Sequence, residues 1–446
     1  MLADTGTALP TDDVYSRNYI GGEWVFPAAP YEFEIRNPAD STITAVVPLS
    51  SRNDVNRAIA AAQAIDKGEW ADPERRVQLL MALLDRLNAL EPELVKLQCG
   101  ETGLSAEDSA AALRATLAVA RALVFEVEGR ADCRQQGASG HVLSWGLPLA
   151  EMLTSVFATL VRGMSVVVKP SLRGPLSPVA VALAASQVGF PPGSINVVQG
   201  TGVDVGAALI GSSLLDELHV HGNPGTLAQA RRAEPRTGVP LRTLSAGGNV
   251  AIIYPEIDDR QISAMAAKAA VGLRIHSTGG PFGQTTVAVH DSVAPRALEA
   301  LVSEVGVVSP APLPSEPLRR VAMSRVQRLG ADGGRTMVGR PIPDDIEHRM
   351  GWRMPPVVTD LGNAATAAGR LNSAGEPLGP VLTVVRWTSH DDLDQLFAGQ
   401  RYRAGYASTW GEGFADDRIT FGAVARSLSP LEIACVGTLP LAWAGL

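Results

Sequence analysis

The hydrophobic pattern predicts a long amphipathic helix after Asp72. Asp72 is a helix-capping residue type, Pro73 suits the first helical position, and Glu74 places an acid in the first turn. Apolar residues then recur at the spacing of one helix face: Val77, Leu80, Met81, Leu84 and Leu87. Closer to the N-terminus, Gly21-Gly22 separates β-prone residues, as in a two-residue hairpin turn. We therefore expect a small β element and then a helical region.

From residue 142 onward, short apolar runs alternate with helical stretches. We interpret residues 164–168 as a strand, and we expect Ser177-Pro178 to cap the next helix and Gly189 to end it. Further strands are predicted at 195–198, 217–220 and 250–254. This β-α-β-α order predicts a parallel, doubly wound sheet, which binds ligands at the carboxyl ends of its strands.

Composition excludes several classes of protein. The chain has 446 residues, a net charge of −8 and 46% hydrophobic residues, so it can bury a large core. No run of about 18 uncharged apolar residues predicts a membrane span, and no basic start followed by an apolar run predicts a signal peptide. We expect a cytoplasmic protein. The acidic balance argues against nucleic acid as a partner.

Three cysteines are too few for a disulfide framework, and their spacing predicts no metal site. His219 and His221 would point to the same side of a regular strand, either as a proton-transfer or metal pair or as a hydrogen-bonded structural feature. His276 is a third histidine of interest. Ser144 and Ser245 are conceivable nucleophiles, but no base for either is identifiable in the sequence.

Eight ordered landmarks resemble the aldehyde dehydrogenase superfamily over nearly the whole chain. A single Gly-Gly or Lys-Pro-Ser would be a weak signal, whereas the order and spacing of all eight are those of the family. The landmarks are Tyr19 to Trp24, Asn37-Pro38-Ala39, Glu101-Thr102-Gly103, Trp145 with Pro148-Leu149, Val166 to Ser171, Pro191 to Gly193 with Asn196 to Val198, Gly247-Gly248, and Glu376 with Gly379 to Val381.

The resemblance implies two interleaved, doubly wound α/β domains. Residues 14–246 would form a dinucleotide-binding, Rossmann-like domain and residues 247–430 a catalytic-type α/β domain. Residues 431–446 would form a C-terminal return segment.

The family oxidises aldehydes with a cysteine thiolate, an asparagine amide that stabilises the oxyanion, and a glutamate that activates water. At the corresponding positions this chain has Gly146 for the asparagine and Ser245 for the glutamate. The nucleophile falls on Pro281 or Phe282, depending on a one-residue gap. The resemblance therefore implies that classical aldehyde oxidation has been lost.

The cofactor positions are better preserved. By resemblance, Lys169 would bond the adenosine ribose of NAD or NADP, and Glu376 would hold the nicotinamide ribose. Leu172 replaces the acid that usually follows Lys-Pro-Ser, and the neighbouring Arg173 either favours a 2′-phosphate or is a solvated surface charge. No metal is implied. The remaining expected cofactor-binding residues are Trp145, Ser171, Gly222, Asn223 and Gly247.

Two differences from the family concern assembly. Only fifteen residues separate Gly129 from Trp145, where the family inserts a long hairpin, and the sequence ends at Leu446 without the family's terminal strand. Those pieces form the family's oligomerisation sheet, so a family-type homodimer is not expected. The combination resembles the vestigial second copy of two-domain aldehyde dehydrogenases, which implies a catalytic aldehyde dehydrogenase as partner.

Three hypotheses about the function remain. The first is a non-catalytic structural or regulatory subunit of an active aldehyde dehydrogenase. The second is an NAD(P)-dependent oxidoreductase that acts on an aldehyde or alcohol without a covalent thiohemiacetal. The third is a non-redox enzyme in the remodelled cleft, built on histidine or serine.

Overall fold

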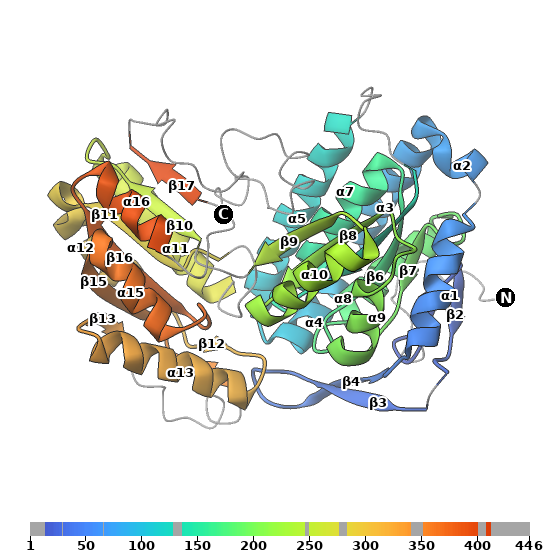
Figure 1. The fold of residues 1–446 in the computed structure, drawn as a ribbon, viewed down its shortest axis with the longest axis horizontal. Helices are drawn as coiled ribbons and strands as arrows, with labels where there is room; N and C mark the ends of the chain where they lie inside the picture. Colours follow the sequence, from blue (N-terminus) through green and yellow to red (C-terminus); the bar gives the residue numbers. More distant parts are fainter. Residues whose placement is uncertain are drawn as a thin grey trace. The chain divides into compact units, whose positions relative to one another are not determined.

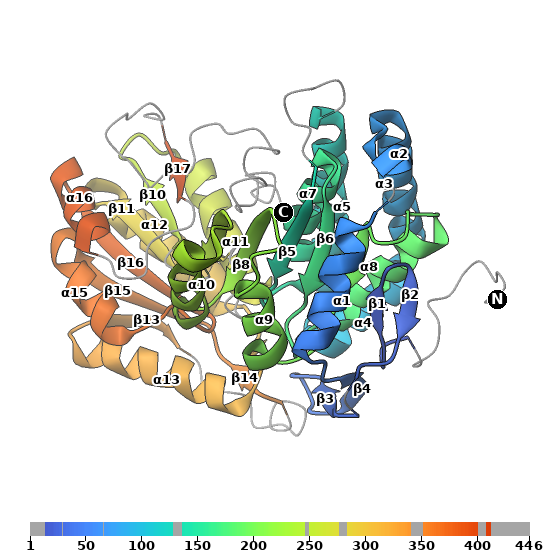
Figure 2. The same ribbon diagram turned by 45° about the vertical axis from the view of Figure 1, so that its right-hand side comes forward.

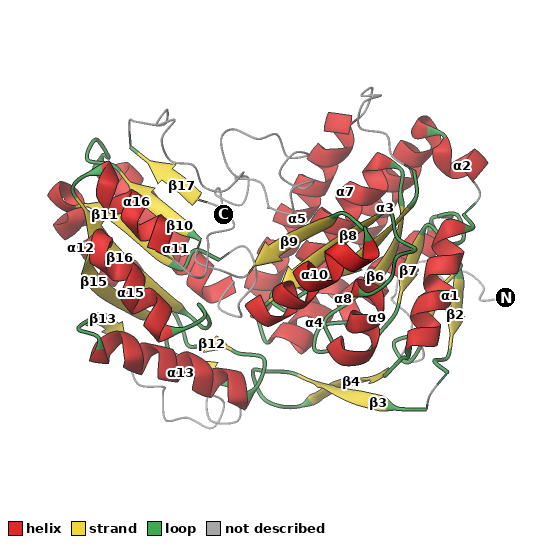
Figure 3. Ribbon diagram, viewed as in Figure 1, coloured by secondary structure: helices red, strands yellow, loops and turns green. Residues whose placement is uncertain are grey.

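The computed structural model describes residues 14–28, 30–65, 67–127, 136–245, 249–275, 283–339, 351–399 and 407–411. The chain divides into two compact units, with the main boundary between Leu244 and Ser245. The short segment Pro38–Ser41 belongs to the second unit although its neighbours in sequence belong to the first. Strands and helices alternate in both units (Figure 3). In the described residues, no helix has both the length and the apolar content needed to cross a bilayer.

Unit 1 contains a seven-stranded sheet with the order β2-β1-β7-β6-β5-β8-β9 (Figure 1). Neighbouring strands from β7 to β8 are parallel, and β1 joins β7 antiparallel. The predicted doubly wound sheet is confirmed. A separate two-stranded ribbon consists of β3 and β4. The strands are β1 (Asn18–Ile20), β2 (Glu23–Val25), β3 (Glu32–Arg36), β4 (Ile43–Pro48), β5 (Ala138–Val142), β6 (Ser165–Lys169), β7 (Ile195–Val197), β8 (Glu217–Gly222) and β9 (Leu241–Ser245).

The helices of unit 1 connect and cover these strands, and Figure 2 shows α1 lying across β6. They are α1 (Arg52–Gln63), α2 (Lys67–Ala71), α3 (Pro73–Ala89), α4 (Glu91–Thr102), α5 (Ala106–Val127), α6 (Pro148–Glu151), α7 (Phe157–Arg162), α8 (Leu176–Gln187), α9 (Ala207–Ile210) and α10 (Pro224–Thr237). Two π-helical turns, η2 (Met152–Val156) and η3 (Gly202–Gly206), precede α7 and α9.

Unit 2 contains a six-stranded sheet with the order β13-β15-β16-β11-β10-β17. All of its neighbouring strands are parallel except β13, which is antiparallel to β15. Its strands are β10 (Val250–Ile253), β11 (Thr286–His290), β13 (Arg335–Gly339), β15 (Val357–Asn363), β16 (Val381–Trp387) and β17 (Ala407–Trp410), and β12 (Ala311–Pro312) pairs separately with β14 (Arg353–Met354). Its helices are α11 (Asp259–Ile275), the 3-10 turn η4 (Asp291–Val293), α12 (Ala294–Gly306), α13 (Glu316–Ala331), α15 (Ala364–Ala374) and α16 (His390–Gly399).

The local predictions hold where short-range chemistry decides the structure. Gly21 and Gly22 have φ angles of 62° and 87° and connect β1 to β2, as the hairpin pattern indicates. Asp72 caps α3, its side chain accepting a hydrogen bond from the Glu74 N–H at 3.0 Å. Gly189 follows the end of α8 with a φ of 85°.

The predicted cap of α8 is wrong. Ser177 and Pro178 lie inside this helix, which begins at Leu176. The Glu101 carboxylate satisfies the free end instead, accepting hydrogen bonds from the N–H groups of Leu176 at 2.8 Å and Ser177 at 3.1 Å. A side chain 75 residues away in sequence thus replaces the local cap, because any acceptor that reaches the first turn can satisfy its N–H groups.

Candidate functional site

Most of the predicted nucleotide-binding residues lie at one edge of the sheet of unit 1. The strands β5, β6 and β8 are parallel and adjacent, so their carboxyl ends lie at the same edge, which we call the carboxyl edge. Lys169 ends β6, and Gly222 ends β8. The structure therefore brings the ends of these strands together, in the position where doubly wound sheets bind ligands. The other predicted residues in this region are Trp145, Ser171 and Asn223.

Lys169 is buried, with 5% of its surface exposed. Burial lowers the pKa of its amino group to about 8. Its amino group makes no hydrogen bond or ion pair with the described residues, and its aliphatic stem passes Gly206 in η3, where an added Cβ would lie 3.9 Å from Cδ. A buried amine without a counter-charge can donate to a ligand hydroxyl, as the ribose assignment requires.

The first turn of α10 is a second feature of the carboxyl edge. The Asn223 side chain caps this helix, accepting a hydrogen bond from the Thr226 N–H at 3.0 Å. Pro224 occupies the first helical position and has no N–H. The end of α10 can still attract an anion through its dipole, but it offers fewer donors than an ordinary helix start.

The Trp145 indole joins Glu101, in α4, to Arg173, in the loop after Lys169. Its N–H lies 3.1 Å from the backbone carbonyls of both Glu101 and Arg173. Glu101 also binds Leu176 and Ser177, so it ties the end of α4 to the start of α8. Burial raises the pKa of Glu101 to about 7, an effect that the hydrogen bonds from these two residues partly offset. The indole N–H therefore fixes the loop.

The same loop carries Ser171 and Arg173. The Ser171 hydroxyl lies 3.5 Å from the Arg173 N–H, in a turn that leads towards α8. The Arg173 guanidinium lies 5.9 Å from the centre of the Phe33 ring. Burial lowers the pKa of this guanidinium. Arg173 is thus stacked on an aromatic ring, an arrangement that holds the cation in place.

Gly146 lies in the segment that follows β5, where the resemblance places an oxyanion amide. In the same segment, Glu151 is fully buried and is bound from two sides. Its carboxylate accepts hydrogen bonds from the Ser144 N–H at 2.7 Å and from the Ser144 hydroxyl. It also contacts Nδ1 of His221 at 3.1 Å. The carboxylate nearest to residue 146 in sequence is therefore engaged by Ser144 and His221.

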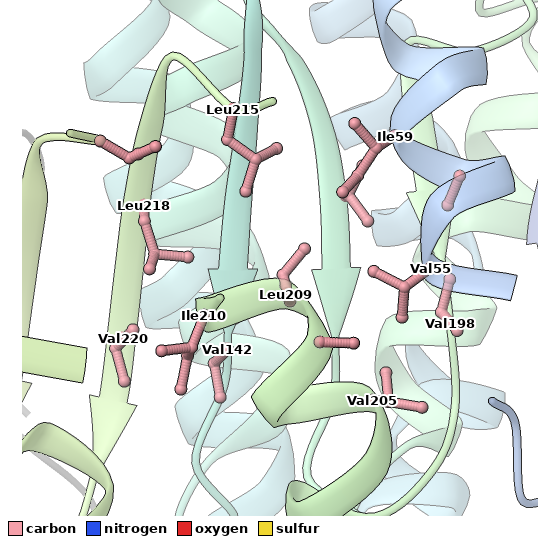
Figure 4. Packing of buried hydrophobic residues seen from close by; sticks show 14 of the residues in the cluster. Val55, Ile59, Val142, Val198, Val205, Leu209, Ile210, Leu215, Leu218 and Val220 are labelled. Carbon is pink, nitrogen blue, oxygen red and sulfur yellow. The ribbon is translucent and has the colours of Figure 1, made fainter. Parts of the chain in front are cut away.

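The sheet has an apolar and a polar face where β5 and β8 pair. Val142, Leu218 and Val220 point to one side and pack against α1, α9 and α10 (Figure 4). The alternate residues point to the other side, towards α6, η2 and α7. We call this second side the polar face; its members are Ser139, His141, Glu217, His219 and His221, all buried.

Hydrogen bonds and ion pairs compensate the burial of the polar face. Arg162 forms a buried ion pair with Glu217, which also contacts Nε2 of His219 at 2.9 Å. Burial raises the pKa of Glu217, but the hydrogen bonds and charges of His219 and Arg162 outweigh it and hold that pKa well below its usual range. Burial lowers the pKa of His219, and Glu217 opposes that shift only in part.

His141 and His219 form the second half of this arrangement. Their rings stack with centroids 4.5 Å apart and an interplanar angle of 15°. Burial and the neighbouring His219 lower the pKa of His141 far below its usual value. The stacked rings are therefore neutral around pH 7, which avoids two adjacent buried cations.

Three imidazole nitrogens of the polar face have no hydrogen-bond partner: Nδ1 of His141, Nδ1 of His219 and Nε2 of His221. His219 and His221 do point to the same side, as strand alternation predicts, but each contacts a carboxylate. Among the described residues, no group of three His, Cys, Asp or Glu side chains is placed to hold a metal ion. Two of the three imidazoles, those of His219 and His221, are thus bound to carboxylates.

The predicted residues of unit 2 are only partly described. Glu376 follows α15, and burial raises its pKa to about 7, while the Arg325 charge lowers it in part. Ser245 is the last residue of β9. Gly247, Pro281 and Phe282 lie outside the described residues, as does His276. The predicted segment 431–446 also lies outside them.

A cavity of about 510 Å³ lies in unit 1 at the opposite edge of the sheet. Its lining includes Gly137, Ser165 and Asp216, which stand at the amino ends of β5, β6 and β8. Arg76 and Arg162 also line it. The Arg76 guanidinium donates to the carbonyls of Trp70 and Val161. Arg162 is paired with Glu217, so both arginines that line the cavity are bound to other groups of unit 1.

Sequence reasoning missed the charged groups of the polar face and of its partners, namely Glu217, Glu151 and Arg162. Glu151 and Arg162 lie in a helical stretch whose sequence is mostly apolar, and Glu217 is an acid at the start of a predicted strand. Their only signal is a charged residue within an otherwise apolar buried segment. Such residues are seldom fully buried without a partner, which is the clue to a network.

The parallel strands of unit 1 and the helices that connect them define a doubly wound α/β fold. A family model described as the aldehyde dehydrogenase family matches residues 24–404. The chain belongs to the aldehyde dehydrogenase family.

Curated relatives cover most of the chain. Geranial dehydrogenase of Castellaniella defragrans is 26% identical over 95% of this chain and 91% of its own. NADP/NAD-dependent aldehyde dehydrogenase PuuC of Escherichia coli is 26% identical over 89% and 83%. Betaine aldehyde dehydrogenase of Brucella anthropi is 28% identical over 84% and 81%. These similarities extend across both units.

Solved structures share the fold. PnpE in complex with nicotinamide adenine dinucleotide has a TM-score of 0.79 at 22% identity, over 90% of this chain and 86% of that one. A variant of aldehyde dehydrogenase C from Pseudomonas syringae, in complex with NAD+ and octanal, has a TM-score of 0.77 at 20% identity, over 91% of each chain. The expected mixed α/β aldehyde dehydrogenase fold is thus confirmed.

Proposed function

We propose that this chain is a nucleotide-binding member of the family that does not oxidise aldehydes through a thiohemiacetal. We further propose that it is a structural or regulatory subunit of an active aldehyde dehydrogenase. The observation that carries this proposal is the segment after β5. It has Gly146 where an oxyanion amide is expected, and its buried carboxylate, Glu151, is bound by Ser144 and His221. That carboxylate is not free to activate water.

The distribution of thiols supports the same conclusion. Cys99 is the cysteine that the structure describes, and it lies in α4 with its sulfur 3.4 Å from the Ser109 hydroxyl. It is held between two helices of unit 1. The family's nucleophile position falls on Pro281 or Phe282, neither of which has a nucleophilic side chain.

Nucleotide binding is supported by Lys169 and the start of α10. When bound, NAD or NADP would supply hydride-accepting chemistry, as it does in the family. Lys169 would donate to a ribose hydroxyl, and the dipole of α10 would attract the pyrophosphate. PnpE, which shares the fold, was solved with nicotinamide adenine dinucleotide. In unit 2, Glu376 is the residue we assign to the second ribose.

A catalytic partner would supply the missing thiol, amide and base. We propose that the two chains form a hetero-oligomer, since the segment before Trp145 is short for a family-type hairpin and the usual homodimer would lack one of its parts. This assembly gives the chain a role that needs no chemistry of its own.

The test combines activity with mass measurement. The purified chain, assayed with propanal and betaine aldehyde and either NAD+ or NADP+, should give no increase in nicotinamide absorbance. Mixed with an active aldehyde dehydrogenase from the same source, it should elute as a complex whose mass by light scattering equals the sum of both chains. Turnover by the chain alone, or separate elution of the two proteins, would contradict the proposal.

A second candidate function is favoured by the pair of Glu151 and His221. A carboxylate on Nδ1 orients an imidazole so that Nε2 can accept a proton. In an NAD(P)-dependent oxidation of an alcohol, His221 would take the hydroxyl proton at Nε2, and Glu151 would stabilise the resulting imidazolium. No thiol would be needed.

This candidate predicts a different outcome of the same assay. With primary and secondary alcohols as substrates, the chain would reduce NAD(P)+, and His221→Gln would lower kcat by about 100-fold or more, as the loss of a general base does. His290→Gln is a matched control, because Nδ1 of His290 forms an exposed hydrogen bond with the Ser292 hydroxyl at 2.8 Å. An equal effect of both substitutions, or no turnover at all, would exclude the candidate.

A further inference from the structure

The cavity of unit 1 lies at the opposite edge of the sheet from the residues assigned to a nucleotide. We call this edge, where β5, β6 and β8 begin, the amino edge; Lys169 and Gly222 stand where strands end. The described residues that line the cavity all belong to unit 1. Its volume of about 510 Å³ is in the range of small-molecule sites in proteins. The cavity can therefore hold a ligand of two fused rings.

Trp70 supplies the cavity with a hydrogen-bond donor. Its side chain is only 2% exposed, and its indole N–H finds no acceptor among the described residues. Phe190 holds the indole in place, with the ring centres 5.7 Å apart and an interplanar angle of 49°. A buried donor without an acceptor is destabilising, so an acceptor atom of a ligand would be bound favourably. Because an indole N–H only donates, the ligand must supply the acceptor.

Asp216 supplies an acceptor on the exposed side of the cavity. One oxygen of its carboxylate accepts a hydrogen bond from the Ala138 N–H at 2.8 Å, and the other accepts none from the described residues. Gly137 permits this approach, since an added Cβ there would overlap the carboxylate. Asp216 is exposed, as are Gln63 and Gln136, so the cavity opens to solvent at these residues. A ligand that enters here can donate an N–H to Asp216.

The charges around the cavity balance one another. Arg76 and Arg162 line it and are both buried. Arg162 forms an ion pair with Glu217, and the Arg76 guanidinium donates to two backbone carbonyls. Asp216 is the second carboxylate, so two cations are set against two anions. The lining also includes the apolar side chain of Ile65. This combination of balanced charge and apolar surface favours a neutral ligand.

We propose that this cavity binds a neutral, fused-ring nitrogen heterocycle of the size of a purine base. An acceptor atom of the ring accepts the Trp70 N–H, and a ring N–H donates to the Asp216 carboxylate. A rigid bicyclic ring carries both groups without losing conformational freedom on binding. The inference depends neither on the proposed subunit role nor on nucleotide binding at the carboxyl edge.

The decisive experiment compares two ligands of the same shape. Benzimidazole has an N–H and a ring nitrogen that accepts a hydrogen bond, whereas indole has the N–H but no acceptor nitrogen. Calorimetry with the full chain at pH 7 should give a dissociation constant about tenfold lower for benzimidazole, a difference of about 1.4 kcal/mol. Equal affinities, or no binding of benzimidazole up to about 1 mM, would overturn the proposal.

The tryptophan indoles report where the ligand binds. The chain has seven tryptophans, so selective 15N labelling gives few indole N–H signals, which single Trp→Phe variants assign. Benzimidazole should shift the Trp70 signal and leave that of Trp387, whose N–H donates to the Ala288 carbonyl at 3.2 Å. NAD+ should not displace the ligand. A shift of the Trp145 signal instead, or displacement by NAD+, would place the heterocycle at the carboxyl edge and overturn the proposal.

Two variants test the individual contacts. Trp70→Phe keeps an aromatic ring and removes the N–H, so it should weaken benzimidazole binding about tenfold and leave indole binding unchanged. Asp216→Asn keeps an oxygen for the Ala138 N–H but removes the charge, so it should weaken both ligands. Asp394→Asn, on the exposed side of α16, is the matched control and should change neither constant.

An equal loss for both ligands in Trp70→Phe would show that the indole N–H makes no contact with the ring nitrogen, which would contradict the proposed binding mode. So would an Asp216→Asn variant that binds both ligands as the wild type does. The comparison of the two ligands uses the wild type alone, and Asp216→Asn replaces an exposed side chain, so the test stands even if Trp70→Phe does not fold.

Discussion

The imidazole of His141 stacks on that of His219, with the two ring centres 4.5 Å apart inside the sheet of unit 1. Both rings have their pKa lowered by burial, so the folded state binds protons less readily than the unfolded chain. As pH falls below about 6.5, the unfolded chain gains protons first. The contribution of these two rings to the free energy of unfolding is therefore fully present above that pH and declines below it.

This relationship predicts a steep acid dependence of the thermal midpoint. Between pH 7 and pH 5 the midpoint of the wild type should fall, and His141→Phe should fall less over the same interval, since it retains an aromatic ring but cannot take up a proton. Calorimetry at several pH values measures both. His290→Gln, a substitution in unit 2, should follow the wild type. A parallel decline in all three proteins would place the acid sensitivity elsewhere.

A second prediction concerns the cap of α8. Leu176 and Ser177 donate to different oxygens of the Glu101 carboxylate, so Glu101→Gln, which replaces one oxygen by an NH2 group, leaves one of the two N–H groups without an acceptor. We expect a loss of about 1–3 kcal/mol in the free energy of unfolding, measured by urea titration. Glu107→Gln, on the exposed side of α5, should change stability by less than about 0.5 kcal/mol.

The ion pair of Arg162 and Glu217 gives a third prediction. Arg162→Met leaves a buried carboxylate beside His219 without its main counter-charge and should cost about 3–5 kcal/mol. The double variant Arg162→Met, Glu217→Gln should recover part of that loss. Arg296→Ala, which removes the exposed pair with Asp259, should cost no more than about 1 kcal/mol. A double variant as unstable as Arg162→Met alone would contradict the assignment of the cost to an unpaired charge.

Lys169 gives a fourth prediction, which concerns stability at alkaline pH. The pKa of its amine is about 8 in the folded chain, against 10.5 as the ordinary value, so folding disfavours the charged form. Stability should rise with pH between these two values and be lowest below about 8. Lys169→Met should therefore stabilise the protein at pH 7, by about 1–3 kcal/mol.

The control for this substitution is Lys96→Met on the exposed side of α4, which should shift the midpoint very little. If Lys169→Met lowers the midpoint at pH 7 and raises it at no pH, the amine must have a partner that stabilises its charge. Binding of NAD+ by calorimetry should weaken in Lys169→Met and persist in Lys96→Met.

Local chemistry made much of unit 1 predictable. The turn at Gly21-Gly22, the cap at Asp72 and the strand that ends at Lys169 each depend on residues within a few positions. The helix cap by Glu101 was not predictable, because its donors are 75 or more residues away. The sequence shows an acid near a glycine but not what that acid meets.

Local rules likewise predict only part of the candidate site. Alternation along β8 predicts that His219 and His221 share a side, and they do. Their partners come from other elements: Glu217 is two residues away on the strand, but Arg162 and Glu151 belong to the helical segment after β5. Packing alone brings these charges together, so the pairing could not be inferred from spacing.

The two-sided character of β5 and β8 also determines how these strands can align. A shift of one residue in β8 would turn Glu217, His219 and His221 towards α1, α9 and α10, into the cluster of Figure 4, and would turn Leu218 and Val220 towards the carboxylates. Every member of both sets would then be in the wrong surroundings. The buried charges thus specify the register of these strands. Substitutions that make the polar face uniformly apolar should yield a sheet that folds into more than one register.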